Sequence, residues 1–174
     1  MKKTKRAPEL DEIVAFMDEY LAAADFNDYD GAKNGLQCAN SGKVGLIATA
    51  VDAGLGEIKL AAHMGANLLI VHHGMFWNPP IPFVGANHDK IKTLVDSDMA
   101  VYSSHLPLDA HPKIGNNALL VKALGLKVIS KCFDFHGSEI GVAAAAPKGG
   151  RDELERRLSA LFPDTFKAIR FGSR

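Results

Sequence analysis

The sequence lacks any long apolar run. No stretch approaches the roughly 20 apolar residues that a membrane-spanning helix requires. The first residues are charged, and no apolar segment with a cleavage site follows them, so no secretory signal is predicted. We therefore expect a cytoplasmic protein with no membrane partner.

The sequence also lacks an excess of charge of one sign. Lysine and arginine together number 20, as do aspartate and glutamate. Because the charges balance, the protein has no overall field that would attract nucleic acid. Residues 1–6 form the only basic cluster, which we interpret as a solvated tail, and we expect no nucleic-acid partner.

Cysteine is scarce, and the motifs of several enzyme classes are missing. Cys38 and Cys132 lie far apart with no CxxC spacing, so neither a disulfide framework nor a thiolate zinc site is predicted. The chain contains no GxSxG, no GxGxxG and no GxxxxGK followed by Ser or Thr, the motifs of serine hydrolases, dinucleotide-binding folds and P-loop enzymes. Ser103 and Ser104 precede a histidine, so nucleophilic catalysis by serine stays an alternative.

What the sequence does contain is an alternation of helical and strand-like segments. Helical spacing of apolar residues alternates with short, β-branched apolar runs. The pattern predicts helices over 8–24, 55–65 and 88–98 and strands over 43–53, 66–73 and 99–105. Such alternation is typical of a parallel sheet covered by helices on both faces. We therefore predict an α/β fold with three α/β/α layers and a mostly parallel sheet.

The C-terminal part of the chain changes character. A helix over 116–125 is followed by a predicted strand over 138–147, a helix over 151–162 and a strand over 165–173. This order indicates the beginning of a second α/β unit. We expect a metal-binding unit over residues 1–130 and a second, truncated α/β unit over 131–174.

Histidines gather where two of the predicted strands end. His72 and His73 close the apolar run "ANLLIVHHGMFW", and His105 and Asp109 follow the next strand in "SSHLPLDAHP". In a parallel sheet, ligands bind at the carboxyl ends of the strands, where these side chains would meet. Neutral imidazoles and carboxylates bind divalent metal ions, and a carboxylate can bridge two of them.

From this spacing we predict His72, His73 and Asp109 as metal ligands. A metal ion would also keep the two adjacent imidazoles neutral. The role of His105 stays open between orienting a ligand and relaying a proton as a catalytic residue. The alternative is that the histidines only form structural hydrogen bonds.

The segment "MFWNPPIPF", which follows the histidine pair, is rich in aromatic residues and proline. Phe76 and Trp77 are candidates for the wall of a substrate pocket, where a planar ring would stack. Loop packing or a subunit contact would explain the same pattern.

Three motifs resemble one known family. The segments "NGLQ", "IVHHGMFW" and "HLPLDAHPKIGNNALLVKALGL", in this order and at these separations, are similar to the Ngg-interacting-factor-three-like family, also labelled GTP cyclohydrolase type two or dinuclear metal-centre proteins. The resemblance implies intertwined α/β/α repeats, of which this chain would hold one and a half, and a ring-shaped homohexamer. It also implies a two-metal site with ligands at His72, His73 and Asp109, and with His105 lining the pocket.

The same resemblance points to a missing element. The family pattern contains a later histidine followed four residues on by a glutamate, and this sequence has no such motif. We expect that the chain is truncated relative to the family, and that its second sheet is left with an exposed strand edge.

Two functions remain as hypotheses at this stage. The first is a hydrolase that uses two divalent ions (zinc, iron, manganese, cobalt or nickel) on a small nucleotide-like or cyclic substrate, resembling GTP cyclohydrolase type two. The second is a non-enzymatic metal-binding, scaffold or regulatory interaction protein that uses the same ligands. The sequence leaves open whether the protein is an enzyme.

Overall fold

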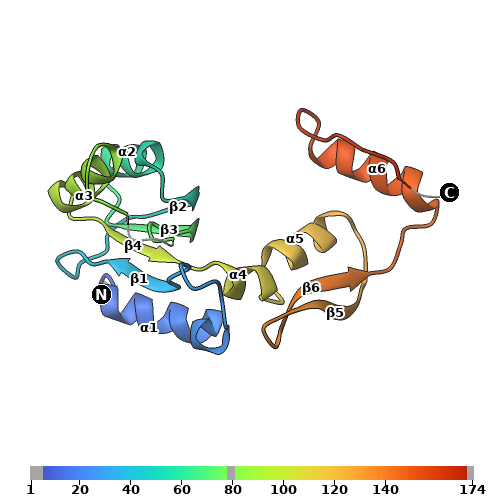
Figure 1. The fold of residues 1–174 in the computed structure, drawn as a ribbon, viewed down its shortest axis with the longest axis horizontal. Helices are drawn as coiled ribbons and strands as arrows, with labels where there is room; N and C mark the ends of the chain where they lie inside the picture. Colours follow the sequence, from blue (N-terminus) through green and yellow to red (C-terminus); the bar gives the residue numbers. More distant parts are fainter. Residues whose placement is uncertain (1–5, 78–80, 172–174) are drawn as a thin grey trace, which may run out of the picture. The chain divides into compact units, whose positions relative to one another are not determined.

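The computed structural model describes residues 6–77 and 81–171. The chain divides into two compact units, Met1–Leu108 and Asp109–Arg174 (Figure 1).

The first unit is built on a four-stranded sheet with the order β1-β4-β3-β2. The neighbouring strands β2, β3 and β4 are parallel, and β1 pairs with β4 in the antiparallel sense. The predicted α/β fold with a mostly parallel sheet is therefore confirmed. The strands are β1 (Gly35–Cys38), β2 (Ile47–Asp52), β3 (Leu68–His73) and β4 (Ala100–Ser103).

Helices cover both faces of this sheet (Figure 1). The helix α1 (Leu10–Leu21) lies on one face, and α2 (Leu55–His63) and α3 (Ala86–Asp96) lie on the other. Alternate residues of β3 serve the two faces, because side chains alternate along a strand: Leu68 packs with α1, whereas Leu69 packs with α2 and α3. Burial of each such side chain stabilises the fold by about 1.5–3 kcal/mol.

The first helix begins with a reciprocal cap. The backbone N–H of Glu9 donates to the carboxylate of Glu12, and the Glu9 side chain accepts from the backbone of the same turn. Two of the N–H groups that a helix start leaves without partners are satisfied in this way. The helix ends at Ala22, which adopts the left-handed conformation and leads into the short 3₁₀ helix η1 (Ala23–Asp25).

The segment after η1 contains a strand that the sequence did not predict. Gly35 opens β1 with a φ of 99°. The strand is four residues long, which is too short for its alternation to stand out, and it forms because β4 offers it an antiparallel partner.

The second unit is an antiparallel hairpin with helices. The helix α4 (Leu106–Ala110) contains the unit boundary, and α5 (Asn116–Ala123) precedes the paired strands β5 (Val128–Phe135) and β6 (Ser138–Ala144). His136 and Gly137 both adopt positive φ between the strands, as a two-residue hairpin turn requires.

The last helix, α6 (Gly150–Leu161), is tied to the end of α5. Arg157 donates to the carbonyl of Leu124 over 2.7 Å and pairs with Glu153 on its own helix. The strand predicted over 165–173 is wrong for the residues that the structure describes, since 165–171 contain no strand and lack a strand to pair with. The boundary between the two compact units lies after Leu108. The boundary expected from the sequence, near residue 130, lies within β5. The domain assignment over 1–130 and 131–174 stays a prediction.

Within the described residues, no helix is both long and apolar enough to cross a membrane.

Candidate metal centre

The end of β3 brings His72 and His73 together. In an ideal strand their side chains would point to opposite faces, yet their ring centroids lie only 4.5 Å apart. The chain turns at Gly74, where a Cβ atom would overlap the side-chain amide of Gln37. That amide accepts a hydrogen bond from the backbone N–H of Met75 and donates one to the carbonyl of Lys33, so it holds the turn in place.

His105 joins this pair from the next strand. It follows β4, the parallel neighbour of β3, and its ring centroid lies 4.9 Å from that of His72 and 5.6 Å from that of His73. One ligand atom from each histidine lies within 4.8 Å of the others. Of the residues described, these three are the ones that gather closely enough to hold a metal ion.

Each of the three imidazoles is held through its Nδ1 atom. His73 Nδ1 lies 2.7 Å from the Asp52 carboxylate, His105 Nδ1 lies 2.9 Å from Asp28 Oδ1, and His72 Nδ1 lies 3.1 Å from the Ser104 carbonyl oxygen. Carboxylate and carbonyl oxygens only accept, so these contacts assign the proton to Nδ1 and the lone pair of the neutral ring to Nε2. This arrangement is the usual one for histidines that ligate metals.

Asp28 is the more buried of the two carboxylate partners, with a side chain only 4% exposed, against 61% for Asp52. Burial would raise the pKa of its carboxyl group, but hydrogen bonds from Asn34, from His105 and from the backbone N–H groups of Tyr29 and Leu106 outweigh that effect. The pKa of Asp28 is therefore lowered, and the group is an anion at neutral pH.

Asn34 connects this anion to the backbone of His105. Its Nδ2 donates to Asp28 over 2.9 Å, and its Oδ1 accepts from the backbone N–H of His105 over 2.7 Å. In the sequence, Asn34 stands out only as part of the "NGLQ" motif. No role in the site was predicted for Asp28 or Asp52. A carboxylate near a strand end is too common to be singled out without its partner.

Aromatic side chains stand beside His105. The ring of Trp77 meets that of His105 edge-on at 5.2 Å, and Tyr29 lies 5.9 Å from it. Together with Asp30 and Gly31, these three residues line a pocket of about 480 Å³. One of the two aromatic residues predicted for a substrate pocket, Trp77, is thus placed beside the histidines.

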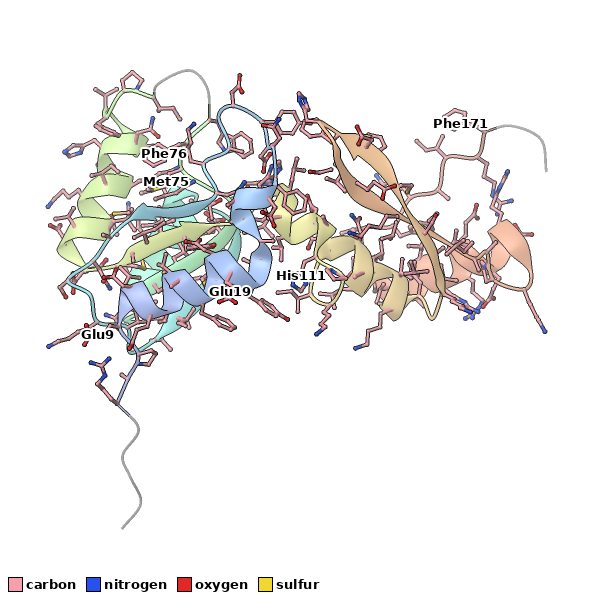
Figure 2. The ribbon with its side chains drawn as sticks, turned by 90° about the horizontal axis from the view of Figure 1, so that it is seen from below. Glu9, Glu19, Met75, Phe76, His111 and Phe171 are labelled. Atoms are coloured by element: carbon pink, nitrogen blue, oxygen red, sulfur yellow. The ribbon has the colours of Figure 1, made fainter. Side chains whose placement is uncertain are left out.

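Phe76 lines a different, apolar pocket. This pocket of about 290 Å³ lies between the helix α3 and the segment that follows β3, which contributes Met75 and Phe76, both labelled in Figure 2. Its other lining residues are Ile81, Phe83, Asn87, Lys90 and Ile91. Phe76 is not part of the pocket that His105 lines.

The two serines that precede His105 are buried. Ser103 donates to the carbonyl of His72, and Ser104 is 1% exposed, with a hydroxyl that has no hydrogen-bond partner among the described residues. A nucleophile must reach its substrate, so this burial argues against catalysis by either serine.

Asp109 is the first residue of the second unit. Its carboxylate accepts from Nδ2 of Asn116 over 2.7 Å, and its carbonyl accepts from Asn117. In the same unit, Nδ1 of His111 accepts from the backbone N–H groups of Lys113 and Ile114. The roles predicted for Asp109 as a ligand and for His105 as a proton relay stay predictions.

The fold and this histidine cluster define a mixed α/β protein with a candidate metal centre at the carboxyl edge of a parallel sheet. The family model Duf34/NIF3 (NGG1p interacting factor 3) matches residues 8–170, and the chain belongs to this family. The resemblance drawn from the sequence motifs is therefore confirmed.

Curated relatives carry the name GTP cyclohydrolase 1 type 2 homolog. The protein from Deinococcus radiodurans is 40% identical over 152 residues, which are 87% of this chain and 57% of the relative. The protein from Escherichia coli K12 is 40% identical over 121 residues, 69% of this chain and 48% of the relative. The chain thus spans about half the length of these relatives.

Solved structures agree with this assignment. Protein ybgI, of unknown function, is 34% identical with a TM-score of 0.76, and the match covers 87% of this chain and 60% of that one. TTHA1606 from Thermus thermophilus is 34% identical with a TM-score of 0.74, and the match covers 89% of this chain and 62% of that one.

Proposed function

We propose that this protein is a divalent-metal-dependent hydrolase that acts on a small nucleotide-like or cyclic substrate, as the name of its curated relatives suggests. The observation that carries the proposal is the set of three imidazoles, His72, His73 and His105, each held at Nδ1 by an acceptor. The pocket beside them gives a small molecule access to the same place.

The residues of the site have different roles in this proposal. Imidazole nitrogens suit zinc, iron, manganese, cobalt and nickel. A divalent ion, when bound, would lower the pKa of a bound water and polarise the bond under attack. Tyr29 and Trp77 provide faces and edges for stacking a planar ring, and the Asp28 carboxylate keeps His105 in one orientation.

The number of ions, the bridging ligand and the oligomeric state in this proposal are supported by the family resemblance. We propose a second ion, with Asp109 as a bridging ligand, and a ring-shaped homohexamer, because the family resemblance implies both. We also propose that the protein is cytoplasmic and that its partner is a small molecule rather than nucleic acid or a membrane.

A second function is favoured by the family's description, which names an interaction with NGG1p. In this case the chain would bind metal as a scaffold or regulatory protein and would catalyse no reaction. It requires the same three histidines, so metal binding alone does not separate the two functions.

The experiment that separates them joins metal analysis to a substrate screen. The natively purified chain would be analysed for its metals and then tested against nucleoside triphosphates and cyclic nucleotides, with and without added Zn²⁺, Mn²⁺, Fe²⁺, Co²⁺ or Ni²⁺. The hydrolase proposal expects turnover that requires metal and that His73→Ala abolishes, while His63→Ala, an exposed change on α2, leaves it intact. Bound metal without turnover would support the scaffold, and failure to bind any of these ions would contradict both functions.

A further inference from the structure

The apolar pocket beside the helix α3 is separate from the candidate metal centre. Its apolar lining consists of Met75, Phe76, Ile81, Phe83 and Ile91. None of the three clustered histidines is among the described residues that line it. Met75 packs against the hydrophobic core, so the pocket adjoins the interior of the first unit. Its volume of about 290 Å³ is close to the lower end of the range for small-molecule pockets, about 300–1,000 Å³.

The wall formed by Ile81 and Phe83 is held against α3. The side-chain amide of Asn87 donates to the carbonyl of Pro82, between these two residues, over 3.3 Å. The apolar side chains of this wall nevertheless stay in contact with water, and Phe83 is 63% exposed. A ligand with an apolar body would remove part of this surface from water, which is the main driving force for burying apolar groups.

Lys90 is the one charged residue among the described residues that line the pocket. It is half-buried, and it forms no ion pair with another described residue. Lys92, two residues further on, pairs instead with Asp96 over 2.6 Å. The acidic neighbour Asp89 lies 3.2 Å from His88 and is not part of the lining. The pocket thus combines apolar surface with one positive charge that no acidic side chain compensates.

This combination selects the charge of a ligand. Asn87 and Lys90 lie in the first turns of α3, where the backbone dipoles of a helix add a partial positive charge. A carboxylate would form a charge-assisted hydrogen bond with the ammonium group of Lys90. A cationic ligand would meet only repulsion there, and a neutral one would gain no ion pair.

We propose that this pocket binds a small amphiphilic carboxylate, whose apolar chain lies against Phe76, Ile81 and Ile91 and whose head group binds Lys90. The inference goes beyond the proposed hydrolase and does not depend on the metal site, because the two sites have no lining residue in common.

Isothermal titration calorimetry of the full chain with octanoate tests the proposal, with octanol as a neutral ligand of similar shape. We expect saturable binding of octanoate that is about tenfold or more tighter than that of octanol, as a hydrogen bond between charged groups provides. Hexanoate, which is two methylene groups shorter, should bind about 15-fold more weakly, since each buried methylene is worth about a factor of four. No saturable binding, or equal affinity for octanoate and octanol, would overturn the inference.

Reversal of one charge gives a sharper comparison. Lys90→Glu should abolish octanoate binding and create binding of octylammonium, which the wild type should reject. The matched control is Lys92→Glu, an exposed position on the same helix, which should keep the preference for octanoate. A preference that Lys90→Glu leaves unchanged, or that Lys92→Glu reverses equally, would contradict a role for Lys90.

Methyl ¹³C spectra of the wild type locate the ligand without any variant. Octanoate should shift the signals of Met75, Ile81 and Ile91 and leave those of Ile13 in α1 and Ile129 in β5 unchanged. The opposite pattern would place the ligand elsewhere. If the pocket signals change when the protein alone is concentrated, and not with octanoate, then a second copy of the chain covers the pocket and the inference fails.

Discussion

Asp52 and His73 are the last partners in the parallel ladder of β2 and β3, and the imidazole of His73 lies 2.7 Å from the Asp52 carboxylate. The same register that pairs the backbones thus places an acceptor beside the histidine. Because Asp52 is 61% exposed, water competes for its carboxylate, and its influence on His73 should be weaker than that of Asp28 on His105.

We therefore predict that Asp52→Asn weakens zinc binding by about tenfold, the lower end of the effect of an outer partner. Isothermal titration calorimetry measures the zinc affinity of this variant, and Asp25→Asn, an exposed change in η1, serves as the control. A loss larger than that caused by Asp28→Asn would contradict the ranking by burial.

Gly74 is predicted to tolerate no side chain. In Gly74→Ala the new Cβ would meet the Gln37 amide, which two hydrogen bonds hold in place, so the variant should lose about 1–3 kcal/mol of unfolding free energy and bind metal more weakly. The matched control is Gly56→Ala in α2, where the structure leaves open space around the new Cβ. That change should stabilise the protein by up to about 1 kcal/mol, because alanine is the better helix former. Urea unfolding compares the two, and equal effects would contradict the steric argument.

The buried Tyr102 should make stability depend on alkaline pH. Burial, together with its hydrogen bond to Asp18 and the charge of that residue, raises the pKa of Tyr102 above its ordinary value. A raised pKa contributes stability that is complete below the unfolded value of about 10 and is lost as the pH rises from there towards the folded value.

Tyr102→Phe tests this dependence. At pH 7 the variant should lose about 1 kcal/mol, the usual net worth of a hydrogen bond. Between pH 9 and pH 11 the unfolding free energy of the wild type should fall more steeply than that of the variant. If the unfolding free energies of the wild type and the variant, measured by urea titration, fall in parallel with pH, then Tyr102 does not contribute to the pH dependence of stability.

Trp77 should report on metal binding. It is the only tryptophan of the chain, and its ring lies 5.2 Å from that of His105 and 6.0 Å from that of His73. Co²⁺ quenches nearby indole fluorescence whereas Zn²⁺ does not, so Co²⁺ should quench the emission in a saturable way and Zn²⁺ should prevent it. His73→Ala should remove the saturable quenching, and quenching that persists in this variant would place the ion elsewhere.

The sequence alone determined those parts of the protein that depend on neighbours along the chain. The apolar run before His72 is a strand because its residues pack on two helical layers, and its histidines stand at the ligand-binding edge because parallel strands end there. The helices α1, α2 and α3 follow from apolar spacing for the same reason. The hairpin strand β5 was missed, since most of its side chains are exposed and carry little pattern.

Only the tertiary structure decided which residues support the histidines. Asn34 and Asp28 precede His105 by 71 and 77 residues, and Asp52 precedes His73 by 21. Such contacts arise from the order of the strands and from the loop that returns after η1, and local residue spacing carries no information about either. The same holds for Trp77 and Phe76, which are adjacent in the chain but line different pockets.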